Sequence, residues 1–297
     1  MQTKRQIQQL LESAGIRPNK RLGQNFLIDL NLMRFLVKSA DVQKNDIVLE
    51  VGCGTGSLTA LLAERAGGVI AVETDRKLIE IAQKQLEKAE NIKFFSADIL
   101  ENKKNINHDV KKLITQIREK YAGRFLLVSN LPYNIASSLI FNLITGPTRA
   151  DEMYFTVQKE VADRLIAAAG SKNYGILSVF LAATGIVKII RRLKPSVFWP
   201  QPKVDSAMVS FIFDPKKASR IANIELFGRI VGFFMQYRRK TLKACSKLAG
   251  GKFKQIFDWS EIFEKCSINP FWRPNQLSSE DYLNLTKYIE KKLKKFY

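Results

Sequence analysis

Three glycines at alternate positions mark the first candidate for a ligand-binding site. Gly52, Gly54 and Gly56 follow the aliphatic run 47–51, and apolar residues at helical spacing begin at Leu58. Glycines at a strand-to-helix turn let the backbone bend tightly and approach a ligand, because no Cβ atom intervenes. The dinucleotide-binding pattern would need a glycine at position 57, which is Ser57 here. The turn therefore favours a nucleotide-like cofactor without phosphates, and S-adenosylmethionine is the common one.

Two carboxylates end the next two predicted strands. Glu73 closes the run 69–73, and Asp98 follows the run 92–97. Glu73 can accept hydrogen bonds from both hydroxyls of a ribose and would repel a 2′-phosphate, which argues against NADP. Asp98 can accept a hydrogen bond from an adenine amino group. Either acid alone could cap a helix, but two acids at strand ends beside the glycine turn favour a cofactor site.

A proline-containing segment follows the fourth predicted strand, 125–129. It consists of Asn130, Leu131, Pro132 and Tyr133. The proline biases Leu131 toward an extended conformation, so that its carbonyl can face the pocket. Asn130 offers a side-chain acceptor and Tyr133 an aromatic ring. This segment could hold a planar exocyclic amine while a base stacks on the ring; an ordinary turn is the alternative that its position disfavours.

The elements that position these residues alternate between short aliphatic runs and amphipathic stretches. The predicted strands are 47–51, 69–73, 92–97, 125–129, 153–157, 187–193 and 207–213, and the predicted helices between them are 58–65, 77–89, 137–144 and 159–169. Strands alternating with helices imply crossover connections and a parallel sheet covered on both faces. We predict a doubly wound, mostly parallel α/β domain over residues 1–214.

The pattern changes after Pro215. Apolar residues then recur only at helical intervals, and Ser278 with Asp281 forms a plausible capping box. We predict a smaller all-helical domain over residues 215–297. The polar stretch 102–120 is predicted to hold an extra short helix, with His108 in a solvent-exposed loop.

Charge and composition restrict the function classes. The chain of 297 residues has a formal net charge of +20 and is 46% hydrophobic, which excludes general disorder. More than half of that net charge lies in residues 215–297, and a basic surface attracts nucleic acid. The expected RNA-facing clusters are Lys4, Arg5, Arg17, Lys20 and Arg21 in the first domain and Arg238, Arg239, Lys240 and Lys243 in the second. Three dispersed cysteines, no zinc pattern, no membrane span and no signal peptide predict a cytoplasmic protein without a metal.

Together the motifs resemble the KsgA-type ribosomal RNA adenine dimethyltransferases. The blocks that carry the resemblance are 20–27 (KRLGQNFL), the glycine turn, Glu73, Asp98, 130–135 (NLPYNI) and 198–206 (FWPQPKVDS). The glycine turn is shared by many methyltransferases, whereas the first and last blocks are strongly specific. The resemblance runs from about Lys20 to the Arg273-Pro274 stretch.

The resemblance implies a class I methyltransferase fold and a defined reaction. The family transfers two methyl groups from S-adenosylmethionine to N6 of each of two adjacent adenosines, in a hairpin loop near the 3′ end of small-subunit (16S) rRNA. It implies a monomer that acts on the assembling 30S subunit. Its cofactor contacts map onto Asn25, Leu27, Gly52, Glu73, Asp98 and Asn130, and its target-base residues map onto Asn130, Leu131, Pro132, Tyr133 and Phe198, with Phe198 closing the base against Tyr133.

Four alternatives stay open at the sequence level. An Erm-type enzyme would methylate large-subunit rRNA, although the 130–133 and 198–206 blocks favour the small-subunit type. An organellar relative that doubles as a transcription factor is possible, although no transit peptide is visible. An NAD-dependent dehydrogenase would share the sheet and Glu73 but lacks the third spaced glycine. A non-enzymatic assembly factor would be expected to have a damaged cofactor site, and this one is whole.

Overall fold

The computed structural model describes residues 1–19, 22–250, 253 and 258–294, which fold into two compact units. The first comprises Met1–Ala162 and Lys188–Ile212, and the second comprises Asp163–Val187 and Phe213–Tyr297. The predicted boundary after residue 214 lies close to the point after Ile212 where the chain finally enters the second unit. The prediction differs in that it groups residues 163–187 with the first domain. No helix among the described residues has the length and apolar character needed to cross a bilayer.

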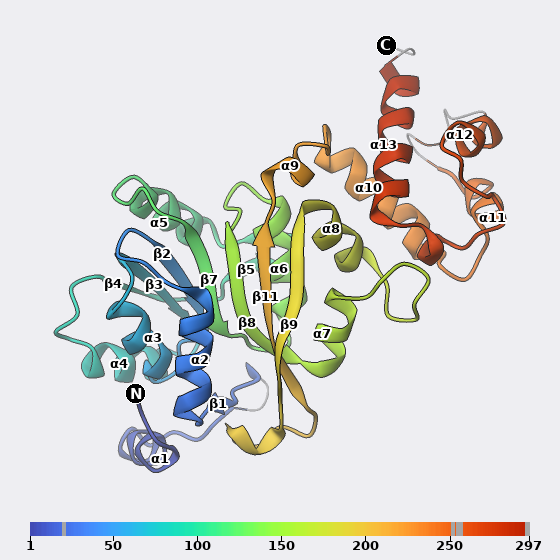
Figure 1. The fold of residues 1–297 in the computed structure, drawn as a ribbon. Helices are drawn as coiled ribbons and strands as arrows, with labels where there is room; N and C mark the ends of the chain where they lie inside the picture. Colours follow the sequence, from blue (N-terminus) through green and yellow to red (C-terminus); the bar gives the residue numbers. More distant parts are fainter. Residues whose placement is uncertain (20–21, 251–252, 254–257, 295–297) are drawn as a thin grey trace. The chain divides into compact units, whose positions relative to one another are not determined.

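A seven-stranded sheet forms the centre of the first unit (Figure 1). Its strands, in spatial order, are β4 (Ile92–Ser96), β3 (Gly68–Glu73), β2 (Ile47–Val51), β7 (Phe125–Asn130), β8 (Glu152–Gln158), β11 (Ser206–Phe213) and β9 (Gly185–Leu193). Strands β2, β3, β4, β7 and β8 pair in parallel, and β11 pairs with β8 in antiparallel register. The strand order reverses between β2 and β7, so the crevice at their carboxyl ends is where a ligand is expected.

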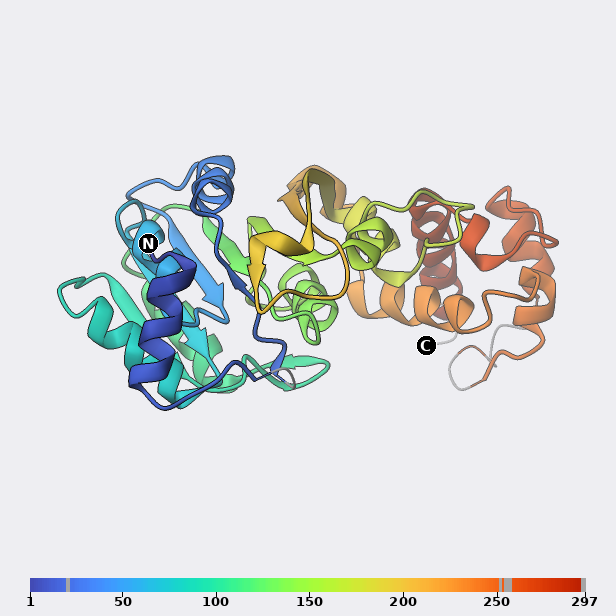
Figure 2. The same ribbon diagram turned by 90° about the horizontal axis from the view of Figure 1, so that it is seen from below.

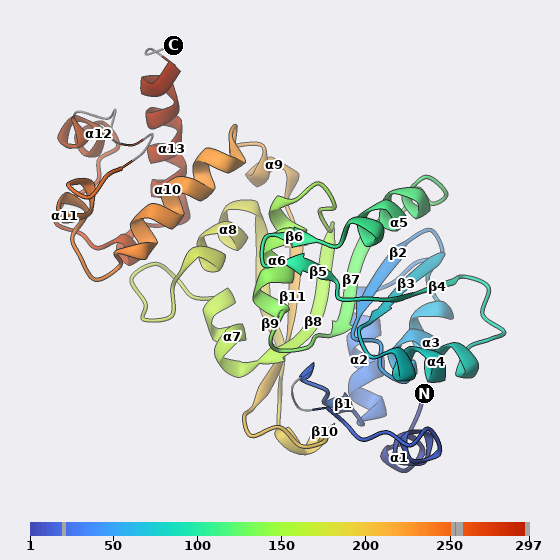
Figure 3. The same ribbon diagram turned by 180° about the vertical axis from the view of Figure 1, so that it is seen from behind.

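Every residue of β2 and β3 is buried, because helices cover both faces of this sheet. Val48, Val69 and Leu126 pack in one core with α2 (Leu30–Ala40) and α3 (Ser57–Ala63). Figure 1 shows α2 in front of the sheet, and Figure 3 shows α5 (His108–Arg118) and α6 (Ala136–Thr145) on the opposite face. The predicted doubly wound, mostly parallel fold is confirmed.

Several elements of the first unit differ from the sequence prediction. Helix α2 was not predicted, and neither was the hairpin of β5 (Leu100–Asn102) and β6 (Asn105–Ile106). The extra helix expected within 102–120 is α5, and His108 is its exposed first residue rather than a loop residue. Asn107 caps this helix by accepting a hydrogen bond from the backbone N–H of Asp109 at 3.0 Å.

Two short elements lie at the end of the sheet where α1 (Lys4–Ser13) is found (Figure 2). Strands β1 (Phe26–Leu27) and β10 (Phe198–Trp199) pair in antiparallel register, with Leu27 opposite Phe198. Helix α4 (Arg76–Gln85) follows β3 and contributes Leu78 to a small core with Ile7 and Leu11 of α1. The N-terminal segment therefore packs beside the carboxyl ends of the strands.

Among the described residues of the second unit, the regular structure is helical apart from the start of β9 and the end of β11. Its helices are α8 (Ile176–Thr184), α9 (Pro215–Ala218), α10 (Ile224–Gln236), α11 (Leu242–Ser246), α12 (Trp259–Lys265) and α13 (Ser279–Lys294), and α7 (Lys159–Leu165) leads into it. Three aromatic rings pack together in an edge-to-face or tilted arrangement, with ring centroids no more than 6.4 Å apart; they are Phe234, Trp259 and Phe263. The predicted capping box of α13 is confirmed, since the backbone N–H of Asp281 donates to Ser278 Oγ at 3.1 Å.

Candidate functional site

The glycine turn after β2 has a backbone that only glycine adopts easily. Gly52, Gly54 and Gly56 have φ angles of 78°, 56° and 85°. A Cβ atom on Gly52 would lie 2.9 Å from Pro132 Cγ, and one on Gly54 would lie 2.9 Å from Phe26 Cε1. The absence of side chains therefore lets the turn pack against both the proline segment and strand β1.

Glu73 lies at the end of β3 with both carboxylate oxygens engaged. Oε2 accepts from the backbone N–H of Gly54 at 3.0 Å, and Oε1 accepts from the backbone N–H of Asp75 at 3.0 Å. The side chain is buried, and this burial raises its pKa above the usual range while the backbone hydrogen bonds oppose the shift. The Thr74 hydroxyl also donates to Oε1, at 3.3 Å. Glu73 is thus a fixed acceptor on the glycine turn, and its Oε2 has capacity for a further donor.

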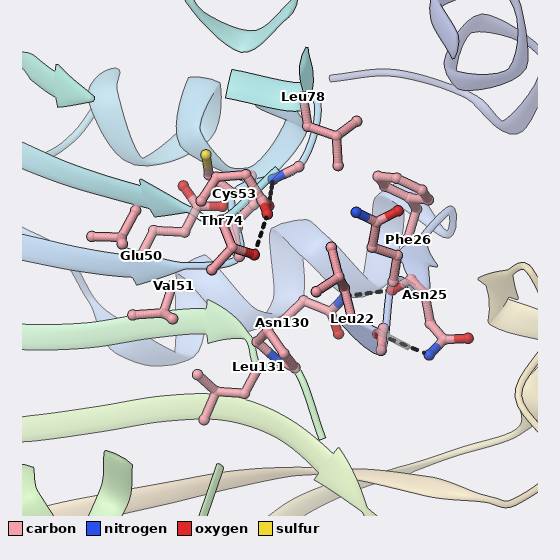
Figure 4. A pocket seen from close by; sticks show the side chains of 18 of the residues that line it. Leu22, Asn25, Phe26, Glu50, Val51, Cys53, Thr74, Leu78, Asn130 and Leu131 are labelled. Atoms are coloured by element: carbon pink, nitrogen blue, oxygen red, sulfur yellow. Dashed lines mark hydrogen bonds between the residues drawn. The ribbon is translucent and has the colours of Figure 1, made fainter. Parts of the chain in front are cut away.

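Glu50 is a second buried acid beside the same turn, and the sequence analysis did not single it out. Its side chain lines the pocket together with Val51 and Cys53 (Figure 4), and its Oε2 has no hydrogen-bond partner among the described residues. Burial raises the pKa of Glu50 to about 8, with a smaller contribution from the negative charge of the nearby Glu73. An acid within an otherwise aliphatic strand was the signal that could have identified it.

Asn130, at the end of β7, is fixed by hydrogen bonds at both ends of its amide. Its Nδ2 donates to the backbone carbonyl of Asn25 at 2.8 Å (Figure 4), and its Oδ1 accepts from Thr156 Oγ1 on β8. The carbonyl oxygen has two lone pairs and can accept a second hydrogen bond. Thr156 was not identified from the sequence, because only the pairing of β7 with β8 brings it opposite Asn130.

Tyr133 is anchored at its far end. Its hydroxyl lies 2.7 Å from Ser206 Oγ at the start of β11, which fixes the direction of the ring. Burial raises the pKa of this phenol, so it stays neutral at physiological pH. Leu131 is buried and Pro132 packs on Gly52, so the 130–133 segment forms one wall of the pocket.

The loop that contains Asn25 crosses the opposite side of the pocket. Gln24 Nε2 donates to Asp75 Oδ2 at 3.0 Å, and Asn25 Nδ2 donates to the carbonyl of Gly23 at 3.1 Å. The Phe26 ring stacks with Trp199 at a centroid distance of 6.1 Å and an interplanar angle of 24°. These contacts hold residues 23–27 between β3, β7 and β10. The predicted cluster members Lys20 and Arg21 lie outside the described residues.

The N-terminus supplies a further contact that sequence reasoning missed. The backbone N–H of Gln2 donates to Ser57 Oγ at 3.1 Å, and its Nε2 donates to the Thr55 carbonyl at 3.0 Å. Its Oε1 accepts from the hydroxyls of Thr55 and Ser57. Gln2 thereby ties α1 to the outer side of the glycine turn, while Ile7 of α1 lines the pocket.

One pocket brings together nine of the ten predicted site residues. Asn25, Leu27, Gly52, Glu73, Asp98, Asn130, Leu131, Pro132 and Tyr133 all line it. Asp98 is exposed, and its Oδ1 accepts from the backbone N–H of Leu100 at 2.9 Å. Phe198 is not part of this lining, because its side chain is buried in the core shared with α2 and α3.

The glycine turn, the strand-end acids and the doubly wound sheet define a Rossmann-like methyltransferase fold. A family model described as ribosomal RNA adenine dimethylase matches residues 15–291. The chain belongs to this family, whose members are methyltransferases, and the resemblance and enzyme class predicted from its motifs are confirmed.

Relatives and solved structures agree with this assignment. The chain is 35% identical to a ribosomal RNA small subunit methyltransferase A from Pelotomaculum thermopropionicum, over 94% of each chain. It is 34% identical to the protein of that name from Geobacter metallireducens, over 93% of this chain and 97% of the other. A dimethyladenosine transferase from Plasmodium falciparum shares the fold with a TM-score of 0.71 and 24% identity, over 89% of this chain and 97% of the other. The structure of the 23S rRNA methyltransferase ErmE matches with a TM-score of 0.61 and 21% identity, over 89% of this chain and 99% of the other.

Proposed function

We propose that this protein dimethylates N6 of two adjacent adenosines in the 3′-terminal hairpin loop of small-subunit rRNA, with S-adenosylmethionine as the methyl donor, during assembly of the 30S subunit. The observation that carries the proposal is the single pocket in which the cofactor-type acids and the 130–133 segment meet. Relatives that match nearly the whole chain act, by their names, on the small ribosomal subunit.

The pocket residues fit the donor chemically. Glu73 would accept hydrogen bonds from the ribose hydroxyls, and Asp98 would accept from the adenine amino group. Gly52 would allow the donor to approach the backbone, and Asn25 and Leu27 would close the pocket from the loop before α2. When bound, the donor supplies an electrophilic sulfonium methyl group.

The 130–133 segment would prepare the target amine. N6 of adenine is a weak nucleophile because its lone pair is delocalised into the ring. Asn130 Oδ1 and the Leu131 carbonyl would accept its two N–H bonds and favour a pyramidal nitrogen, while Tyr133 would stack on the base. The proton becomes more acidic after methylation and can leave to water, so the pocket needs no general base. Phe198 is buried in the core and would reach the base only after a rearrangement of its side chain.

A methylation assay tests the proposal. Incubation with labelled S-adenosylmethionine and a mixture of unmethylated small and large subunits, followed by nucleoside analysis of each rRNA, should yield N6,N6-dimethyladenosine in small-subunit rRNA. Label in large-subunit rRNA alone would instead identify an Erm-type enzyme and overturn the proposal, as would label in neither.

Two variants of Tyr133 connect the product to this pocket. Tyr133→Ala removes the stacking ring and should reduce methyl transfer roughly a hundredfold or more at nearly unchanged donor affinity. Tyr133→Phe loses only the contact with Ser206 and should retain most of the activity. Wild-type turnover in Tyr133→Ala would show that the base does not bind at this wall.

A further inference from the structure

The most exposed large apolar side chain among the described residues lies in the second unit, away from the donor-binding residues in sequence. Phe271 is 67% exposed, and its neighbour Trp272 is 38% exposed. Exposed aromatic rings stabilise a fold little, because they bury little apolar area. Two of them side by side in a strongly basic unit therefore call for an interaction partner.

The turn that carries these rings, residues 269–273 and hereafter the aromatic turn, is held rigidly by backbone hydrogen bonds. The N–H groups of Phe271 and Trp272 donate to Asn269 Oδ1 at 2.9 Å and to the Asn269 carbonyl at 3.0 Å. The carbonyl of Trp272 accepts from Leu242 at 2.8 Å, and that of Pro270 accepts from Lys243 at 2.8 Å. The backbone that carries the rings is thus held in place, which lowers the entropy cost of ordering the turn on binding.

One lysine contacts the aromatic turn, and further cations lie near it in the sequence or precede the helix bonded to it. Lys243 Nζ lies 5.6 Å from the centroid of the Phe271 ring, and Arg273 follows the turn as an exposed residue. The exposed residues 238–240 are Arg, Arg and Lys, and they directly precede the helix to which the turn is bonded. Arg238 Nη2 also donates to the carbonyl of Lys172 at 2.8 Å, which adds a further exposed lysine.

Aromatic rings combined with cations match the chemistry of unpaired RNA. Each base has a π-face that can stack on a ring, and its phosphate can pair with a neighbouring lysine or arginine. Duplex RNA offers the same phosphates but keeps its bases stacked internally, so it cannot use the rings. An apolar protein partner would use the rings but would gain nothing from four or more adjacent cations.

We propose that Phe271 and Trp272, together with Lys243, form an accessory contact that stacks unpaired nucleotides of the ribosomal RNA outside the methylation pocket. The proposal rests on the proposed function, because it takes ribosomal RNA as the partner. It assigns to the aromatic turn a role that is separate from the donor and base contacts of the first unit.

Binding of short RNAs tests the contact without any methylation step. The probes are a ten-nucleotide oligoadenylate and a ten-base-pair RNA duplex, and the variants are Phe271→Ala, Trp272→Ala and the double substitution. Each single substitution should weaken oligoadenylate binding roughly five- to a hundredfold, the range for one stacked base, while duplex affinity changes less than twofold. Phe271→Trp should retain binding, and Phe271→Leu, which keeps an apolar side chain but no ring, should not.

Matched controls separate stacking from charge and from folding. Ile224→Ala removes a comparably exposed apolar side chain, 39% exposed, from the same unit and should leave RNA affinity unchanged. Lys243→Ala should lower the salt dependence of oligoadenylate binding by about 0.7 in the log–log slope, whereas the aromatic variants should keep the wild-type slope. Thermal unfolding should be the same in all variants, because the substituted side chains are exposed.

The outcomes distinguish this inference from the proposed function. Wild-type oligoadenylate affinity in the double variant would overturn the accessory contact even if methylation proceeds normally. A variant that binds RNA normally but no longer binds intact small subunits would also overturn it and indicate a protein contact. Loss of single-strand binding in a protein that methylates nothing would support the contact while refuting the proposed reaction.

Discussion

At the scale of single residues, the orientation of Asn130 depends on a partner outside the motif that contains it. Its amide nitrogen is engaged by the Asn25 carbonyl, so its oxygen must face Thr156 and the pocket. A rotated amide would place two donors against the Thr156 side and remove the acceptor that a target amine needs. Thr156 is therefore a positioning residue for the proposed transfer, and it does not itself contact the reacting atoms.

Replacement of Thr156 by valine tests this role. Thr156→Val preserves the shape of the side chain but removes the hydroxyl, so Asn130 loses the hydrogen bond that fixes its oxygen. We expect methyl transfer to fall roughly tenfold, equivalent to about 1–2 kcal/mol of barrier, with donor affinity nearly unchanged in calorimetric titration. Thr156→Ser keeps the hydroxyl and should restore activity. Equal rates in the valine and serine variants would contradict the positioning role.

The buried Glu50 gives the stability of the protein a defined pH dependence. Its pKa is raised from about 4.5 to about 8, so the folded state favours the neutral acid. The stabilisation is complete below the unfolded-state pKa and is lost as pH rises through about 8. We expect the wild-type melting temperature to fall more between pH 6 and pH 9 than that of Glu50→Gln, whose side chain is neutral throughout. The corresponding difference in the free energy of unfolding should be a few kcal/mol at most. Parallel pH profiles would mean that Glu50 ionises normally.

At the scale of elements, the central strands were predictable and their surroundings were not. The prediction 47–51 matches β2, and 125–129 and 153–157 fall inside β7 and β8, because fully buried strands appear as uninterrupted aliphatic runs. The pair β1 and β10 escaped prediction, since two-residue strands leave no periodic signal. The contact between Gln2 and the glycine turn joins residues 53 or more positions apart, which no local pattern indicates. Most of the predicted site residues lie at strand ends and line one pocket, whereas the residues that support them were not predicted.

The N-terminal segment is predicted to hold the glycine turn in its binding conformation. Gln2→Ala removes the side-chain hydrogen bonds to Thr55 and Ser57, which support the turn from its outer side. We expect donor affinity to fall roughly fivefold to thirtyfold, since each hydrogen bond contributes about 0.5–1.5 kcal/mol, with little effect on RNA binding. Gln9→Ala alters an exposed glutamine of the same helix and should match the wild type. Isothermal titration with S-adenosylmethionine measures both, and equal affinities would show that α1 does not support the turn.

At the scale of the whole molecule, the net charge of +20 should strengthen the binding of RNA but contribute little to the binding of the methyl donor. RNA is a polyanion whose binding releases counterions, so its affinity depends steeply on salt. The methyl donor carries a sulfonium, an ammonium and a carboxylate, and in the proposed binding mode it is held by hydrogen bonds to the pocket residues. The excess positive charge is therefore not expected to increase the affinity for the methyl donor.

This contrast predicts two different salt responses from one protein. Between about 50 and 200 mM salt, affinity for small-subunit rRNA should fall by roughly two orders of magnitude or more if several phosphates are contacted, while donor affinity should change less than about threefold. Substitution of Arg239 by glutamine should reduce the RNA slope by about 0.7–0.9 and leave donor binding unchanged, because Arg239 lies outside the donor pocket. Filter binding for RNA and calorimetry for the donor, in the same buffers, make the comparison. A steep salt dependence of donor binding would contradict a site in which the donor is held by local hydrogen bonds to Glu73, Asp98 and the glycine turn.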